Sequence, residues 1–177
     1  DHGELLGDHG IYMKGPFFYE PSVRVPLIVS MPGVVQPQVV ADLVELIDLP
    51  ETILDACELK RHPGMQGSSL WPILRSGASS DRQKKDVYCE FYADRFAGRD
   101  HVSPNADATM LRDDHHKIVI CHDSDGGELY DLVEDPGEHT NLWYSADHRA
   151  LKSELVERLA HRIAATADPT PARAAPW

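Results

Sequence analysis

Four short β-type runs between residues 87 and 132 constrain the fold of this chain more than any other feature. They are residues 87–92, 108–111, 117–121 and 128–132. Polar turn clusters at 112–114 and 123–127 separate the last three runs. Short runs between such clusters are typical of strands joined by hairpins. The spacing predicts a small antiparallel meander.

A long amphipathic stretch follows the meander, over residues 146–166. Apolar side chains recur there at every fourth position, and two more widen the stripe. The stripe consists of Leu151, Leu155, Leu159 and Ile163, with Val156 and Ala160 beside them. This period is typical of a helix with one apolar face. We expect that face to pack on the sheet rather than to offer a groove to a partner.

The first part of the chain has a different character. Residues 1–24 are rich in Gly, His, Asp and aromatic side chains without a sustained period, which indicates an ordered functional loop. The β-branched run over 25–31 stops at a Pro-Gly pair and predicts a buried strand. Pro26 would then lie at the start of that strand, where a missing N–H is tolerated.

A helix is predicted over residues 48–57. Asp48 is followed three residues later by Glu51, with a proline between them, an arrangement that resembles a capping box with proline in the first turn. The following segment, 61–86, is rich in Pro, Gly and Ser and then charged. It reads as a connector with one helical turn around 70–74.

These elements together predict an α/β chain with an α+β C-terminal part. The change from strand-and-helix pattern to meander places the expected boundary after residue 86. We therefore expect one part over residues 1–86 and a second over 87–177, in which a small antiparallel sheet is packed by a helix and followed by a Pro/Ala-rich tail.

Composition excludes several classes of protein. The chain has 177 residues and a formal net charge of −12, which opposes nucleic-acid binding because that binding rests on Lys and Arg meeting phosphates. No apolar run approaches the ~18 residues needed to span a membrane. Cys57, Cys89 and Cys121 include no CxxC pair, so a disulfide framework or thiolate zinc site is not expected. Free thiols slightly favour a reducing compartment such as the cytoplasm, and no other feature of the sequence indicates where the protein is located.

Asp1 and His2 are the first candidates for chemistry. A carboxylate and an imidazole offer one oxygen and one nitrogen ligand to a divalent metal. Adjacent residues of a strand point to opposite faces, so both reach one metal only where the strand ends and the backbone turns. Gly3 permits such a turn.

The order of motifs along the chain resembles the sulfatase family. The segment Asp1-His2-Gly3-Glu4 is followed by Gly7-Asp8-His9-Gly10, Lys14-Gly15, Tyr19-Glu20 and Arg24-Val25-Pro26-Leu27-Ile28. Later landmarks are Asp48-Leu49-Pro50-Glu51-Thr52, Gln66-Gly67-Ser68-Ser69-Leu70-Trp71-Pro72, Glu128-Leu129-Tyr130-Asp131-Leu132, Glu134-Asp135-Pro136-Gly137-Glu138 and Thr140-Asn141-Leu142. Nearly the whole chain is covered by this resemblance.

The resemblance implies a fold, a site and an activity. The fold would be the C-terminal part of the alkaline-phosphatase-like α/β sandwich of sulfatases. Asp1 and His2 would bind a divalent metal, which is Ca²⁺ in many members and Mn²⁺ in some. Lys14 would contact the sulfate or the leaving-group oxygen, and an ammonium aimed at a developing oxyanion stabilises it. His9 would either contact substrate or hydrogen-bond the backbone of its turn, while Glu20 and Arg24 would form a structural ion pair.

The nucleophile that the resemblance implies is not found in these residues. It would be a formylglycine made from Cys or Ser in a C/S-x-P/A-x-R motif. Cys57 lies four residues before Arg61, but Leu59 occupies the position of the Pro or Ala, so Cys57 is interpreted as a core or helix-boundary residue. The first pair of metal-binding aspartates is also missing. We therefore expect the chain to be the C-terminal portion of a longer enzyme and to be inactive alone.

Two further patterns imitate metal sites. Asp123, Asp125 and Glu134 have the spacing of positions in an EF-hand loop, but Glu128 stands where the sharp turn requires Gly. A hairpin turn is the better interpretation. The remaining candidates flank a predicted strand and are interpreted as solvated turn histidines: His115, His116 and His122.

The predicted function is metal-dependent hydrolysis of a small-molecule sulfate ester, with the nucleophile supplied by the missing N-terminal part. Two alternatives stay open. One is a phosphonate or phosphate ester hydrolase of the same superfamily, slightly favoured by His at position 2 in place of Asn. The other is a non-catalytic domain for interaction or homo-oligomerisation, whose stability would not depend on metal.

Overall fold

The computed structural model describes residues 1–76, 84–92, 107–122 and 124–166. The chain divides into two compact units, each built from two segments. Residues 1–28 and 85–160 form what we call the sheet unit, and 29–84 with 161–177 form the helical unit. Among the described residues, none of the helices combines the length and apolar character needed to cross a membrane.

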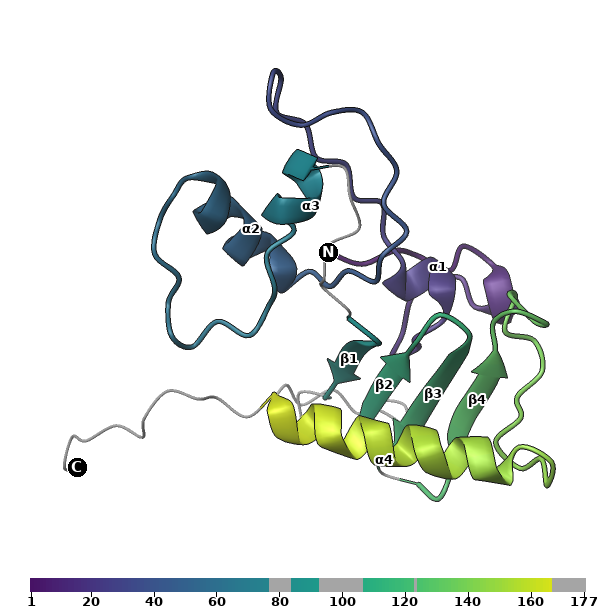
Figure 1. The fold of residues 1–177 in the computed structure, drawn as a ribbon. Helices are drawn as coiled ribbons and strands as arrows, with labels where there is room; N and C mark the ends of the chain where they lie inside the picture. Colours follow the sequence, from purple (N-terminus) through teal and green to yellow (C-terminus); the bar gives the residue numbers. More distant parts are fainter. Residues whose placement is uncertain (77–83, 93–106, 123, 167–177) are drawn as a thin grey trace, which may run out of the picture. The chain divides into compact units, whose positions relative to one another are not determined.

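The sheet unit contains a four-stranded antiparallel meander with the spatial order β1-β2-β3-β4 (Figure 1). Its register places Met110 opposite both Cys89 and Val119. Each strand is paired with the next in the sequence, so the predicted meander is confirmed. The strands are β1 (Val87–Phe91), β2 (Ala108–Arg112), β3 (His116–Cys121) and β4 (Gly127–Asp131).

One face of this sheet is covered by the N-terminal segment. Phe18 packs with Ala108, Met110 and Val119 in a buried apolar cluster, and Val23 packs against its edge. Side chains two residues apart in a strand share a face, so this face belongs to alternate positions of β2 and β3. The segment itself forms two short helices, η1 (Asp8–Gly10) and α1 (Glu20–Val23).

The opposite face of the sheet carries a second set of buried side chains. Leu111, Ile118 and Leu129 are opposite one another in the register and are fully buried. Helix α4 (Arg149–Ala165) lies across the sheet, and its most buried side chains are Leu155 and Leu159. The predicted helix and its predicted packing role are both confirmed.

The helical unit is organised around a buried carboxylate. Asp48, the first residue of α2 (Asp48–Ala56), is fully buried and accepts hydrogen bonds from the backbone N–H of Glu45 at 2.8 Å and of Ser68 at 2.7 Å. The Lys84 ammonium lies 2.8 Å from the same carboxylate. These contacts join α2 to the loop before α3 (Trp71–Ser76).

The predicted capping box at α2 is wrong. Ile47 occupies the N-cap position and no side chain caps the helix. The Asp48 carboxylate accepts its hydrogen bonds from residues outside the helix instead. The other member of the predicted box, Glu51, pairs with the Arg61 guanidinium at 2.6 Å. The proline in the first turn is accommodated as predicted.

The predicted buried strand over 25–31 is also wrong. These residues form no strand among the described elements, and Leu27, Ile28 and Met31 are exposed, Ile28 by 91%. A strand buried on both faces requires neighbouring strands on both sides. The described part of the chain contains no strand that pairs with this run. The expected division into 1–86 and 87–177 stays a prediction; residues 1–28 join the strands in the sheet unit.

Candidate functional site

Three residues that the sequence assigns to chemistry lie together at the start of the sheet unit. The Lys14 Nζ atom is hydrogen-bonded to His2 Nε2, and Asp1 Oδ1 lies 3.5 Å from the same nitrogen. The His2 side chain is 43% exposed and that of Asp1 89% exposed. The ammonium, imidazole and carboxylate therefore converge on one solvent-accessible point.

The hydrogen bonds of His2 define its tautomer. Its Nδ1 lies 2.8 Å from the Gly3 carbonyl oxygen, and a carbonyl oxygen only accepts, so Nδ1 carries the proton. In a neutral imidazole the other nitrogen is then unprotonated. The lone pair on Nε2 points to Lys14 and is available either to accept from the ammonium or to bind a metal.

Gly3 fixes the position of this pair relative to α1. Its N–H donates to the Ser22 carbonyl oxygen at 2.8 Å. A Cβ atom at this position would lie 2.0 Å from the Pro21 carbonyl oxygen. The backbone of the candidate site therefore lies directly against α1, at a distance that only glycine allows.

Substitution Gly3→Ala tests this close approach. We expect it to lower the free energy of unfolding by about 1–3 kcal/mol, because the backbone of residues 3 or 21 has to move to admit a methyl group. Urea unfolding followed by circular dichroism measures the change. Gly126→Ala is the matched control, since its Cβ would meet side-chain hydroxyl groups and no backbone, Ser124 at 3.3 Å and Tyr144 at 4.0 Å. Equal losses for both variants would contradict the account.

A buried lysine holds α1 against the sheet. Lys117 in β3 is 0% exposed, and its Nζ lies 2.8 Å from Glu20 Oε1 and 2.6 Å from Glu138 Oε1. The same ammonium donates to the Phe18 carbonyl oxygen at 2.8 Å, and the Glu20 N–H donates to Glu138 Oε2 at 2.7 Å. We call Lys117, Glu20 and Glu138 the Lys117 cluster.

The charges of this cluster change the acidity of two carboxyl groups. Burial by itself raises the pKa of Glu20, but the Lys117 ammonium together with the Arg112 and Arg24 guanidinium groups outweighs burial, so that this pKa lies below its ordinary value. The pKa of Glu128 in β4 is raised, first by burial and then by the Glu138 carboxylate. Lys117 therefore helps to hold Glu20 as a carboxylate, whereas burial and the Glu138 carboxylate shift Glu128 toward its neutral form.

The lowered pKa of Glu20 predicts a pH dependence of stability. Its contribution is present above the unfolded-state value of about 4.3 and is lost as pH falls through the lower folded-state pKa. Between about pH 5 and pH 3 we expect a smaller fall in the urea midpoint for Glu20→Gln than for the unsubstituted chain. The exposed Glu154 in α4 supplies the control, Glu154→Gln; identical slopes for Glu20→Gln and the unsubstituted chain would contradict the prediction.

His9 lies in a different place from His2. It has a left-handed backbone with φ 54°, and its ring stacks on Tyr19 with centroids 3.6 Å apart. A second ring, that of His139, lies 5.3 Å away. His9 thus packs as part of an aromatic cluster, and the two roles considered for it, a substrate contact or a hydrogen bond to its turn, stay predictions.

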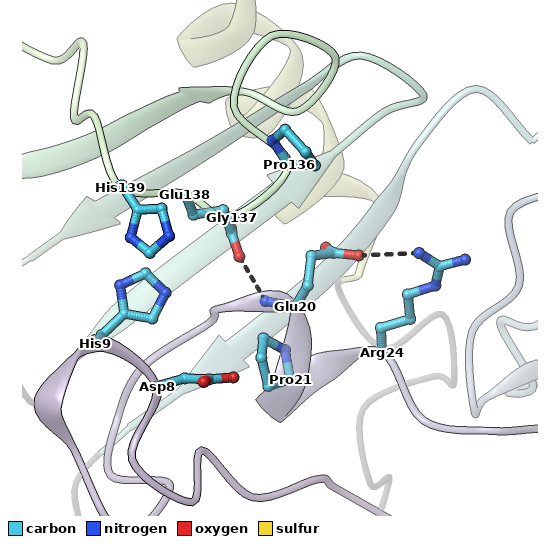
Figure 2. A pocket seen from close by; sticks show the side chains of 9 residues that line it. All are labelled: Asp8, His9, Glu20, Pro21, Arg24, Pro136, Gly137, Glu138 and His139. Carbon is cyan, nitrogen blue, oxygen red and sulfur yellow. Dashed lines mark hydrogen bonds and ion pairs between the residues drawn. The ribbon is translucent and has the colours of Figure 1, made fainter.

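The rings of His9 and His139 border a pocket of about 440 Å³ within the sheet unit (Figure 2). Glu20 and Glu138 line it together with Asp8 and Arg24. The Glu20–Arg24 ion pair is long, at 3.9 Å, and Arg24 is largely exposed. The predicted structural pair therefore exists, but Glu20 makes its shorter contact with Lys117.

The other sequence candidates lie apart from this site. Cys57 follows the last residue of α2 and is exposed, as expected of a helix boundary. Asp123 lies outside the described residues, while the β3–β4 pairing confirms the hairpin interpretation. His122 hydrogen-bonds Thr109 Oγ1 at 3.0 Å, and His115 is exposed. Among the described residues, no three His, Cys, Asp or Glu side chains are grouped to bind a metal ion.

Sequence reasoning missed Lys117 and the role of Glu138. Lys117 sits in a short β-type run, where a lysine reads as a residue of the solvent face. Glu138 lies in the 134–138 motif, which resembles the sulfatase family but does not indicate a structural role for this residue. No local sequence signal identifies them, because their burial depends on contacts between distant parts of the chain.

Comparisons with known proteins agree with this architecture. Residues 7–165 match the family described as "N-sulphoglucosamine sulphohydrolase, C-terminal". Arylsulfatase K of Gallus gallus is 34% identical over 144 residues, which cover 80% of this chain and 26% of that protein. The chain thus spans about a quarter of the length of the curated relatives it matches.

Solved structures of related hydrolases also resemble this chain. A phosphonate monoester hydrolase of Agrobacterium radiobacter superposes with a TM-score of 0.80 at 27% identity, covering 96% of this chain and 34% of that one. A protein solved in complex with its substrate D-glucosamine-2-N,6-O-disulfate has a TM-score of 0.76 at 26% identity, with the same coverage. The fold is that of alkaline-phosphatase-like hydrolases, the class to which sulfatases belong. Within this class, the chain belongs to the N-sulphoglucosamine sulphohydrolase C-terminal family.

Proposed function

We propose that this chain is the C-terminal portion of a metal-dependent sulfatase-type hydrolase. The enzyme would cleave sulfate esters, and a formylglycine located outside these residues would supply the nucleophile. The observation that carries the proposal is the convergence of Asp1, His2 and Lys14, held by the glycine contact to α1. Membership of a sulphohydrolase family supports a role in sulfate hydrolysis for these three side chains.

Lys14 would act on the leaving group. When the S–O bond of a sulfate ester breaks, negative charge develops on the departing oxygen. A positioned ammonium stabilises that charge by a few kcal/mol where water is scarce. Because Lys14 reaches His2 Nε2, its ammonium would lie close to a sulfate held at this site.

Asp1 and His2 would contribute to a divalent-cation site. Asp1 Oδ1 and His2 Nε2 are 3.5 Å apart. His2 Nε2 carries no proton in this tautomer and would bind a cation when the Lys14 ammonium, its hydrogen-bond partner in this structure, turns to the sulfate. The cation, Ca²⁺ or Mn²⁺, would supply positive charge for the sulfate oxygens. Two donors do not complete its coordination, so the remaining ligands would come from outside this chain.

The experiment is a hydrolysis assay with 4-nitrophenyl sulfate in the presence of Ca²⁺ or Mn²⁺. A longer enzyme that carries these residues is expected to turn over the ester, and the 177-residue chain is expected to be inactive. Turnover by the chain alone would refute the location of the nucleophile. An inactive longer enzyme would refute the sulfatase proposal.

A phosphonate ester hydrolase is the second candidate. The similarity to a phosphonate monoester hydrolase structure, at 27% identity, favours it as strongly as the sulfatase structures favour sulfate. The same enzyme is therefore assayed with 4-nitrophenyl phenylphosphonate. A larger kcat/KM for the phosphonate than for the sulfate would replace the first candidate by the second.

A further inference from the structure

We propose that Lys117 and Glu138 are positioning residues for Lys14 and His2, acting through Glu20 and α1. The inference rests on the proposed function, because it assigns a role in the reaction to residues that do not touch the reacting groups. It extends that function from the exposed site to a buried ion cluster on the sheet.

The first step joins the N-terminal segment to β3 through Lys117 and to the loop after β4 through Glu138. Lys117 donates to the Phe18 carbonyl oxygen at 2.8 Å and lies 2.8 Å from the Glu20 carboxylate. Glu138 accepts from the Glu20 N–H at 2.7 Å. The backbone N–H of Glu20 is therefore held by Glu138 and its carboxylate by Lys117, which fixes the position of Glu20 relative to β3.

The second step runs from Glu20 to His2. Glu20 is the first residue of α1, whose Ser22 carbonyl oxygen accepts the Gly3 N–H at 2.8 Å. Gly3 lies too close to Pro21 to admit a Cβ atom. The backbone that carries Asp1 and His2 is thus fixed against α1, and α1 is fixed by the Lys117 cluster.

The third step runs from Phe18 back to Lys14. Only Gly15, Pro16 and Phe17 separate Lys14 from the carbonyl that Lys117 holds. Pro16 has a fixed φ angle, which further reduces the conformational freedom of the backbone between Lys14 and Phe18. The cluster therefore anchors both arms of the site, one ending at His2 and the other at Lys14.

The chemistry of the cluster favours positioning over stability alone. A buried ion pair costs desolvation, and well-packed apolar side chains of similar volume often stabilise a fold as well or better. Lys117 and Glu138 are 0% and 2% exposed. Directional hydrogen bonds to the Phe18 carbonyl and the Glu20 N–H fix a backbone register, which apolar packing does not.

The test measures kcat and KM for Lys117→Met in the longer enzyme that carries these residues. Displacing a reacting group by about 1 Å costs as much as 10²-fold in rate, so we expect kcat to fall by about 10- to 100-fold with a smaller change in KM. Glu138→Gln is the milder variant: it keeps an oxygen for the Glu20 N–H but loses the charge, and its kcat is expected to fall less. Hydrogen exchange at the Gly3 amide is expected to accelerate in both.

Arg158→Met is the matched control. Arg158 in α4 pairs with Asp113 at 2.6 Å and with Asp86 at 3.2 Å in the same unit. Within the described part of the chain it makes no hydrogen bond or ion pair with residues 1–28. We expect it to lower Tm while leaving kcat and Gly3 exchange unchanged. Unchanged kcat and Gly3 exchange in a folded Glu138→Gln or Lys117→Met enzyme would overturn the inference. An unsubstituted enzyme inactive on both esters would refute the proposed function instead, and the exchange measurement would still test the anchoring.

Discussion

Replacement of Lys14 by alanine is expected to lower kcat about 10²- to 10³-fold in a sulfatase-type enzyme that carries these residues. Loss of a single group that stabilises a developing oxyanion has this magnitude. KM is expected to change less, because the charge on the leaving oxygen exists in the transition state and not in the ground state. Steady-state kinetics with 4-nitrophenyl sulfate measures both constants.

The leaving group provides a sharper version of the same experiment. A more basic leaving oxygen carries more charge that needs stabilisation, so the loss in Lys14→Ala should grow as the pKa of the leaving alcohol rises. Lys60→Ala, which removes an exposed lysine of the helical unit, is the control and should leave kcat unchanged. A uniform loss across all leaving groups would assign Lys14 to sulfate binding instead.

Leu159→Ala is expected to lower the free energy of unfolding by about 2–5 kcal/mol, the usual cost of removing a fully buried leucine side chain. Leu159 is 0% exposed in α4, and the alanine leaves a cavity that the rigid sheet cannot fill. Urea unfolding measures the change, with Glu154→Ala on the exposed face of α4 as the control. A loss below 1 kcal/mol, on the order of a surface substitution, would show that α4 does not form part of the core.

The elements predicted correctly are those whose signals are local. The turn clusters and alternating runs of residues 87–132 define β1 to β4 because each strand pairs with the next one along the chain. The period of α4 is contained within the helix itself. For the site, the motif order at positions 1, 2 and 14 identified three side chains that the structure brings together.

The errors and omissions concern contacts over long distances in the sequence. The run over 25–31 has the composition of a buried strand, but composition cannot supply the flanking strands, and the run is exposed. Asp48 has the right spacing for a helix cap, yet its carboxylate accepts from Glu45 and Ser68. The burial of Lys117 depends on Glu20 and Glu138, which no local pattern connects to it.

The long reach of the Lys117 contacts has a consequence for the order in which the sheet unit folds. The hairpins β2–β3 and β3–β4 close short loops, whereas the hydrogen bond from Lys117 to Phe18 spans 99 residues and that from Glu20 to Glu138 spans 118. Contacts of large sequence separation pay more loop-closure entropy and form late. The N-terminal segment therefore docks after the meander exists, and during synthesis residues 1–28 leave the ribosome long before the surface that orders them. We therefore expect residues 1–28 to become ordered later than the meander.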